Sequence, residues 1–172
     1  YNNIMYLFYR YGDGTDTLYF RMVSSSDGVI WSEPIELFNV SYGEAVSPSV
    51  LYSGGRFYMF TIKNTGSPYT LERRYSTSLN SGWSEPLPTD LIITGFSPWH
   101  LDVINVNGVF VAAISTYGGA SIYLSQSVNN GVNWTVASNA LLNKSESGWD
   151  NEQLYRPTLI KTETGFDMFY SA

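Results

Sequence analysis

The stretches SSDGVIWSEP (25–34) and SLNSGWSEP (78–86) end in the same four residues, and SVNNGVNW (127–134) reaches the same tryptophan after a similar turn. The three tryptophans of these stretches are 52 and 51 residues apart along the chain. A fixed period of roughly 20–50 residues is the sequence signature of a repeat architecture. The chain is therefore expected to consist of structural units of about fifty residues.

Two further landmarks keep the same period. An apolar segment follows a small turn in each unit, and the prolines Pro48, Pro98 and Pro157 precede the last three of these segments. The four segments are NNIMYLFYR (2–10), GGRFYMFTI (54–62), NGVFVAAIS (107–115) and TGFDMFYSA (164–172). Aromatic and β-branched residues in alternation, separated by Gly, Asn and Ser, predict short strands and no amphipathic helix.

Four antiparallel strands in a unit of about fifty residues are typical of a β-propeller blade. We therefore predict an all-β fold, a single partial β-propeller domain built of four-stranded antiparallel blades. The predicted units are 1–46, 47–96, 97–147 and an incomplete 154–172. The chain begins in the second strand of one blade and ends in the second strand of another, which amounts to about three and a quarter blades. Since a ring needs about 4–8 blades, we expect completion by the remainder of the propeller or by other copies of the chain.

Composition excludes several classes of protein. The 172 residues are 44% hydrophobic and 16% aromatic, which excludes a disordered chain. A net charge of −6 argues against nucleic acid as a partner, and no apolar run approaches the ~18 residues needed for membrane insertion. The chain has no cysteine and one histidine, so we predict no disulfide, no metal centre and no cofactor.

Two motifs resemble those of known propeller families. The turn at 127–134 resembles the Asp-box of sialidase-type propellers, with Asn129 in place of the aspartate. The resemblance implies that its Asx side chain binds nearby backbone amides and that its tryptophan packs between blades. SPSVLYSGGRFYMFT (47–61) and YRPTLIKTETGFDMFYSA (155–172) resemble the blade opening of family 43 glycoside hydrolases, which implies a five-bladed ring and a carbohydrate-active protein.

The family 43 catalytic pattern does not transfer as a whole. The resemblance to these enzymes implies a base Asp, an orienting Asp and an acid Glu on successive innermost strands. The base stands in an Arg-Asp-Pro or His-Asp-Pro tripeptide, and this chain contains neither. The candidate residues must therefore be judged by their own chemistry.

The loops 41–48, 94–102 and 148–157 feed the predicted innermost strands and carry most of the polar candidates. When the strands are aligned on their prolines, His100 falls opposite Val50 and Leu159. His100 and Asp102 are two residues apart on one strand and so share a face. An imidazole beside a carboxylate could orient a sugar hydroxyl or tune a proton donor, or the two could form an internal structural pair.

Glu44 and Glu152 are the candidates for a catalytic carboxylate pair, with Asp102 as the third acid. Glycoside hydrolysis needs a protonated acid and an ionised carboxylate about 5–9.5 Å apart. The alternative is that each is a solvated loop acid or a partner for Arg156. Glu33 and Glu85 recur in the WSEP segments, and we interpret them as architectural.

The substrate-binding candidates lie beside these acids. Arg156 could grip a carboxylate or phosphate, or lock Asp150 or Glu152 in place. Trp99 and Trp149 could stack on sugar rings, whereas Trp31, Trp83 and Trp134 are expected to be buried between blades. The predicted binding set is His100, Trp99, Trp149, Arg156, Tyr155 and Asp150.

Two functions follow from this pattern. The first is a carbohydrate-active, glycoside hydrolase-like propeller that binds a glycan or glycan-like polymer at the axial rim and hydrolyses it. The alternative is a non-catalytic glycan-recognition module, such as those of phage tail receptor-binding proteins. Either role predicts an extracellular location, or one on a cell or virion surface.

Overall fold

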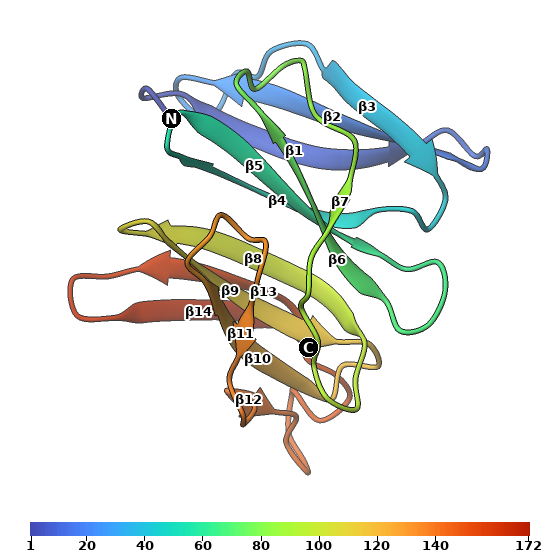
Figure 1. Ribbon diagram of the computed structural model, residues 1–172, viewed down its shortest axis with the longest axis vertical. Helices are drawn as coiled ribbons and strands as arrows, with labels where there is room; N and C mark the ends of the chain where they lie inside the picture. The colour runs from blue at the N-terminus through green and yellow to red at the C-terminus, as the bar shows by residue number, and fades with distance from the viewer.

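The computed structural model describes residues 1–172 as four antiparallel sheets that follow one another along the chain (Figure 1). No helix long and apolar enough to cross a membrane occurs in the fold. The first sheet contains β1 (Met5–Gly12), β2 (Thr17–Ser25) and β3 (Ile35–Ser41). The second contains β4 (Val46–Ser53), β5 (Arg56–Lys63), β6 (Thr70–Ser76) and β7 (Leu87–Pro88). The third contains β8 (Pro98–Val106), β9 (Val109–Thr116), β10 (Ser121–Ser127), β11 (Thr135–Val136) and β12 (Leu142–Asn143). The fourth is the hairpin of β13 (Tyr155–Lys161) and β14 (Phe166–Ser171).

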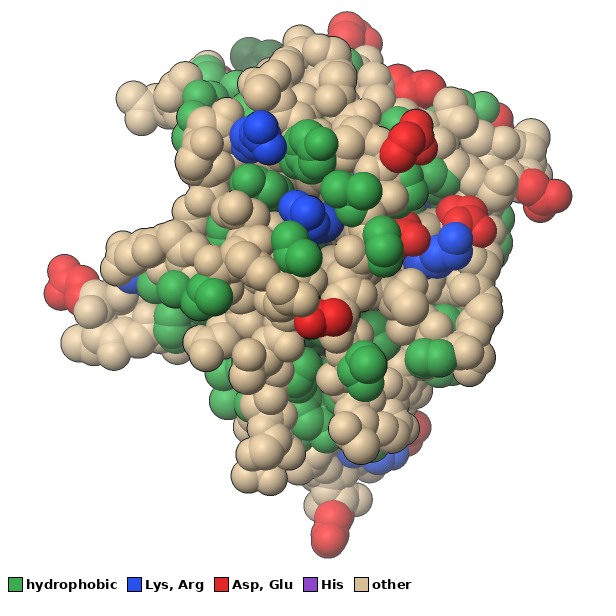
Figure 2. Space-filling model, in the orientation of Figure 1, with side chains coloured by type: hydrophobic (Ala, Val, Ile, Leu, Met, Phe, Trp, Pro, Cys, Tyr) green, Lys and Arg blue, Asp and Glu red, His purple; other side chains and the backbone are tan.

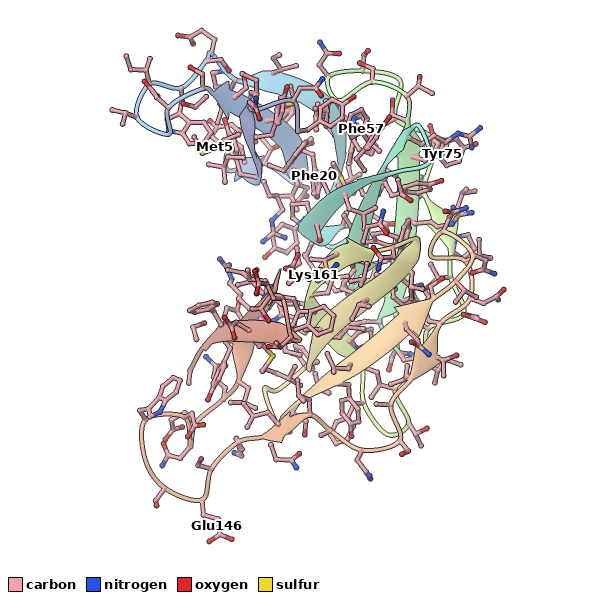
Figure 3. All side chains as sticks on the ribbon, turned by 90° about the vertical axis from the view of Figure 1, so that its left-hand side faces the viewer. Met5, Phe20, Phe57, Tyr75, Glu146 and Lys161 are labelled. Atoms are coloured by element: carbon pink, nitrogen blue, oxygen red, sulfur yellow. The ribbon has the colours of Figure 1, made fainter.

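The sheets are the blades of a partial β-propeller, which confirms the predicted fold class. The innermost strands β4, β8 and β13 pack side by side, with β8 between the other two, and β1 packs against β4. Figure 3 shows the sheets fanned along an arc, with the first sheet and the last hairpin at its two ends. β1 is the repeat equivalent of β5, and the chain ends on β14, the second strand of its hairpin.

Three hydrophobic seams hold neighbouring sheets together. The largest lies between the second and third sheets, where Phe60 meets Phe110 edge to face at 6.0 Å. Smaller clusters around Phe20 and around Leu154 join the outer sheets to this centre. Position along the arc decides burial, since residues 57–62 of β5 are buried on both faces while no residue of β1 is fully buried. A central strand lies between two sheets, whereas an end sheet has a neighbour on one face only.

The three turn tryptophans differ in burial for the same reason. Trp134 is buried and its ring meets Phe60 of the preceding sheet edge to face at 5.7 Å. Trp83 is half-buried and packs on the cluster around Phe20. Trp31 remains 39% exposed, so the expectation of burial between blades is wrong for this residue. No sheet lies on its side of the first sheet to cover it.

The turns before these tryptophans are held by short polar side chains. Asp27 accepts backbone N–H bonds from Val29 and Ile30, each at 2.9 Å, and these bonds hold the pKa of its carboxyl below the usual value. Asn129 accepts the backbone N–H of Asn133 at 2.9 Å in the equivalent turn. Such side-chain-to-backbone bonds satisfy turn amides without a sheet partner, and each turn leads to the outer strand of its own sheet, β3 or β11.

Candidate functional site

Each innermost strand carries a β-bulge near its start, and the three bulges are equivalent. Two residues of the inner strand face one residue of the next strand at each of them. The bulged pairs are Ser47–Pro48 in β4, Trp99–His100 in β8 and Arg156–Pro157 in β13. A bulge interrupts the ladder and re-aims side chains, and bulges are frequent beside functional sites.

The bulges correct the sequence alignment of the prolines. His100 occupies the bulge position of Pro48 and Pro157, so its predicted equivalence to Val50 and Leu159 is wrong. The landmark Pro98 lies two residues earlier, at the last ladder pair before the bulge. The side chain of His100 therefore points where the neighbouring blades present proline rings.

Two bulge residues have unusual backbone conformations. Ser47 has φ 56° and Arg156 has φ 46°, both in the left-handed region that non-glycine residues seldom adopt. Each conformation costs about 1–3 kcal/mol and persists because the surrounding structure holds it. The strain directs both side chains toward the same cavity.

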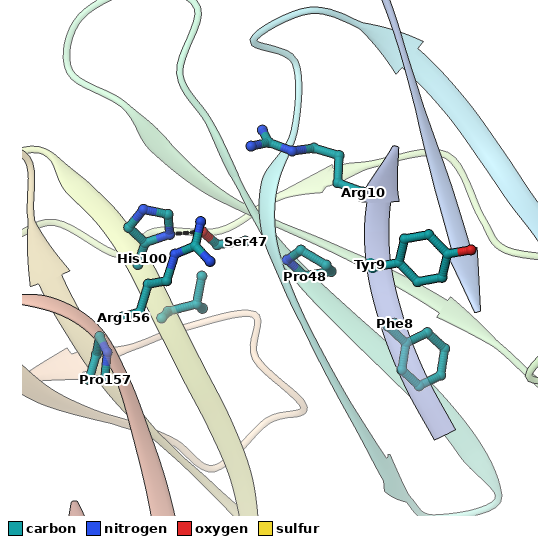
Figure 4. A pocket seen from close by; sticks show the side chains of 9 residues that line it. Phe8, Tyr9, Arg10, Ser47, Pro48, His100, Arg156 and Pro157 are labelled. Carbon is teal, nitrogen blue, oxygen red and sulfur yellow. Dashed lines mark hydrogen bonds between the residues drawn. The ribbon is translucent and has the colours of Figure 1, made fainter. Parts of the chain in front are cut away.

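That cavity, here called the bulge pocket, has a volume of about 380 Å³ (Figure 4). Six of its nine lining residues come from the bulged segments of the three inner strands, and three come from β1. The lining residues are Phe8, Tyr9, Arg10, Ser47, Pro48, His100, Leu101, Arg156 and Pro157. Small-molecule sites are clefts of about this size with a few polar groups among apolar walls.

His100 forms the buried wall of the bulge pocket. Its Nδ1 pairs with the Oγ of Ser47, as the dashed line in Figure 4 marks, while its Nε2 is buried without a hydrogen-bond partner. The ring edge of Tyr155 lies against it, with 4.2 Å between ring centroids. Burial lowers the pKa of His100 to about 4, and the positive charges of Arg156 and Arg10 add to the effect. The imidazole is therefore neutral at pH 7.

Arg10 and Arg156 bring two positive charges to the pocket from opposite walls (Figure 4). Neither guanidinium has a carboxylate within 4.0 Å, since the two ion pairs of the chain are Arg21–Glu36 and Lys63–Glu44. Arg156 lies over the ring of Tyr155, with 5.2 Å from Cζ to the ring centroid. The predicted lock between Arg156 and Asp150 or Glu152 does not form. The bulge pocket is consequently a basic site in an acidic chain.

Asp102 lies outside this pocket and joins three blades. Its carboxylate accepts the hydroxyl of Ser49 on β4 at 3.0 Å. It also accepts the hydroxyl of Thr158 and the backbone N–H of Leu159 on β13, both at 2.9 Å. His100 and Asp102 both reach β4, as their shared face predicts, but each meets its own serine and they do not pair with each other.

The two glutamate candidates also lie apart from the bulge pocket. Glu44 forms an ion pair with Lys63 at 2.7 Å and accepts the hydroxyl of Thr65 at 3.0 Å. These hydrogen bonds hold the pKa of Glu44 below its usual value, which opposes a role as proton donor. Glu152 is exposed and has neither an ion pair nor a hydrogen bond. No carboxylate lines the pocket.

The aromatic candidates separate into two groups. Trp99 is half-buried and packs against Tyr69 and Tyr117, at 5.8 and 5.3 Å between ring centroids. Trp149 is 66% exposed and stacks on Tyr170 at 5.1 Å. The Tyr170 hydroxyl also donates to the buried Asp150 at 3.2 Å. Asp150 therefore stabilises the loop beneath Trp149.

Of the predicted site residues, His100 and Arg156 line the bulge pocket, and sequence reasoning missed Ser47 and Arg10. A signal for Arg10 exists in the repeat. Aligned by its turn, Arg10 occupies the position of Ile62 and Ser115, so a charged side chain replaces an apolar or small one. The same departure from the repeat singled out His100. The signal for Ser47 is its place before Pro48, equivalent to that of Arg156 before Pro157.

Comparison with solved structures identifies the fold family. A thermostable family-43 glycoside hydrolase is similar to this chain with a TM-score of 0.77 and 17% identity, over 99% of this chain and 62% of that one. The GH43 protein BlXynB from Bacillus licheniformis gives a TM-score of 0.75 and 18% identity, over 99% and 35%. The GH32 β-fructofuranosidase BmSUC1 from Bombyx mori gives 0.72 and 13%, over 99% and 39%. These neighbours are five-bladed β-propeller enzymes, so the fold is that of a glycoside hydrolase-like propeller.

The chain spans less than two thirds of the length of each of these three neighbours. No protein-family model matches the sequence, and no curated relative matches it. At such low identity the similarity concerns the fold. The chemistry must be argued from the pocket itself.

Proposed function

We propose that the bulge pocket binds a sugar residue of a glycan and that the chain is the glycan-binding part of a glycoside hydrolase-like propeller. The composition of the pocket wall carries this proposal. Guanidinium, hydroxyl and imidazole groups stand beside flat apolar surfaces from Phe8, Pro48 and Pro157. A sugar presents hydroxyl groups around an apolar ring face, so both kinds of surface find a partner.

Hydrolysis of the bound glycan is the second candidate, and the similarity in fold to glycosidases favours it. Of the three acids, Glu152 is the free one, because Glu44 and Asp102 are engaged in other contacts. We therefore propose Glu152 as the acid or base of such a reaction, with Glu44 and Asp102 as the remaining candidates. Because Glu152 lies outside the pocket, the bond that it would cleave lies beyond the sugar residue held there. A propeller without this reaction would be a recognition module, as in phage tail proteins, on an extracellular, cell or virion surface.

A glycan array combined with a panel of chromogenic glycosides tests both candidates. The wild type is expected to bind glycans, and Arg156→Ala is expected to weaken binding because the residue lines the pocket. Lys161→Ala is the matched control, since this exposed cation lies outside the pocket. Absence of glycan binding would refute the proposal.

The chromogenic panel decides between the two roles. If the wild type releases the chromophore and Glu152→Gln abolishes the release while glycan binding persists, the hydrolase is supported. If the wild type binds glycans and releases nothing, the recognition module is supported.

A further inference from the structure

We infer that the bulge pocket selects a sugar that carries a carboxylate, a hexuronic acid residue of an acidic glycan, an inference that rests on the proposed glycan binding. The first observation is the placement of charge. The chain has 15 acidic and 9 basic side chains, yet the pocket holds two arginines and no acid. Figure 2 shows acidic side chains spread over both the margin and the middle of the face in view.

Three of the other four arginines have an ion-pair or hydrogen-bond partner within the protein, which neither arginine of the pocket has. Arg21 pairs with Glu36 at 3.9 Å, and Arg74 donates to Thr61 at 3.2 Å. Arg73 donates to a backbone carbonyl. Arg56, like Arg156, has no polar partner and lies over an aromatic ring. The guanidiniums of Arg10 and Arg156 make no hydrogen bond to protein, so their donors are available to a ligand.

Two like charges that face one cavity raise the energy of the empty site. Their combined field reaches the buried ring of His100, whose second nitrogen has no partner. A protonated imidazole would add a third positive charge, and burial among cations keeps this group neutral. An anion in the pocket would offset the repulsion between the two arginines.

The geometry of the guanidinium N–H groups and the apolar surfaces of the pocket indicate which kind of anion fits. A guanidinium presents two parallel N–H groups that match a planar carboxylate. The left-handed backbone at Arg156 and the contact of its guanidinium with the Tyr155 ring place one of these forks at the pocket. The apolar surfaces of Pro48 and Pro157 are suited to a ring face, which a uronic acid has and an inorganic oxyanion lacks. The pocket therefore combines a carboxylate clamp with a surface for the sugar ring.

Calorimetry with three probes tests the inference on the full chain. The probes are a hexuronate disaccharide, its neutral counterpart in which hydroxymethyl replaces carboxylate, and inorganic phosphate. The wild type is expected to bind the acidic disaccharide at least roughly tenfold more tightly than the neutral one, with an affinity that falls as salt rises.

Three charge-matched variants separate a clamp from a general charge effect. Arg10→Gln and Arg156→Gln are each expected to weaken uronate binding roughly tenfold and to leave neutral-sugar binding within about twofold. Arg56→Gln, an exposed arginine outside the pocket, is the control and should leave both affinities unchanged. Because the two pocket arginines are exposed, the variants should fold, and far-ultraviolet circular dichroism checks this.

The outcomes distinguish this inference from the proposed function. Equal binding of the acidic and neutral disaccharides, weakened to the same extent by the arginine variants, would overturn the inference and leave glycan binding in the pocket intact. Phosphate binding as tight as that of the uronate would overturn selection for a sugar. Absence of binding by both disaccharides would overturn the proposed function together with the inference.

Discussion

Asp102 should act as a structural tie between blades, and its replacement should reduce the stability of the whole arc. Its carboxylate accepts one bond from Ser49 on β4 and two from β13, at Thr158 and the backbone of Leu159. We expect Asp102→Ala to break all three links at once. The side chain joins strands that come from three successive blades, so the loss acts on tertiary packing and not on one hairpin.

The size of the effect follows from what each donor does after the substitution. The exposed Thr158 hydroxyl can turn to water, and Ser49 retains the carbonyl of Val103 as a second acceptor at 3.4 Å. The N–H of Leu159 is left without its acceptor, which costs about 1–3 kcal/mol for a buried donor. Adding about 1 kcal/mol for the link to β4 predicts a total loss of about 2–4 kcal/mol in the free energy of unfolding.

Asp102→Asn refines the test because it preserves the shape of the side chain. Its amide oxygen can still accept from Leu159, and its NH₂ group can donate to Ser49, so the expected cost is about 1 kcal/mol. The control is Asp167→Ala, an exposed acid of β14 without a hydrogen bond, which should change stability by less than about 0.5 kcal/mol.

Urea unfolding followed by tryptophan fluorescence and by circular dichroism measures these differences. Coincident transitions from the two probes would justify a two-state treatment. The tie would be refuted if Asp102→Ala were as stable as Asp167→Ala, or if Asp102→Asn cost as much as Asp102→Ala.

Three further predictions concern other parts of the molecule. His100 has a pKa of about 4 in the folded chain against 6.5 when unfolded, so protons bind the unfolded state first as pH falls. The free energy of unfolding should thus decrease by about 3 kcal/mol from pH 6.5 to pH 4 through this group. Urea midpoints measured across that range should show this decrease in the wild type and not in His100→Gln. A variant with the same pH profile as the wild type would contradict the prediction. Gly131→Ala should lower the free energy of unfolding by at least about 3 kcal/mol, because at φ 75° its Cβ would lie 2.4 Å from a buried ring of β5. The control Gly108→Ala, in open space, should lower it by about 1–2 kcal/mol. Equal shifts in melting temperature for the two variants would refute the clash. Glu44→Gln should cost less than about 1 kcal/mol and leave glycan binding unchanged, since its ion pair is partly exposed and outside the pocket; loss of binding on the array would contradict this placement.

Local pattern was sufficient to predict the propeller. The repeated turns before Trp31, Trp83 and Trp134, and the apolar segments that follow each unit's small turn, reflect interactions between residues near in sequence. Alternation reports which face of a strand is apolar, and turn residues report where a strand must end. Strand alternation and turn residues can both be recognised in the sequence without knowledge of the neighbouring blades.

The candidate site was predicted only in part, because it depends on register. A bulge exists only when a strand is paired, so the prolines alone misplaced His100 by two positions. The sequence could identify His100 as a departure from the repeat and Arg156 as a cation in the loop before Pro157. It could not indicate that Asp102 faces β13 or that Glu44 meets Lys63. Such partners lie on other strands, and their distances are set by packing.

The chain by itself determined the class of fold, the length of the repeat and the strand at which each end of the chain lies. Only the tertiary structure decided that Arg10 and Arg156, from the two ends of the chain, share one pocket. The physical reason is that a blade forms from contacts within about fifty residues, whereas the pocket forms where separate blades converge. The arc brings its first and last sheets to the same cavity, and no local pattern records that approach.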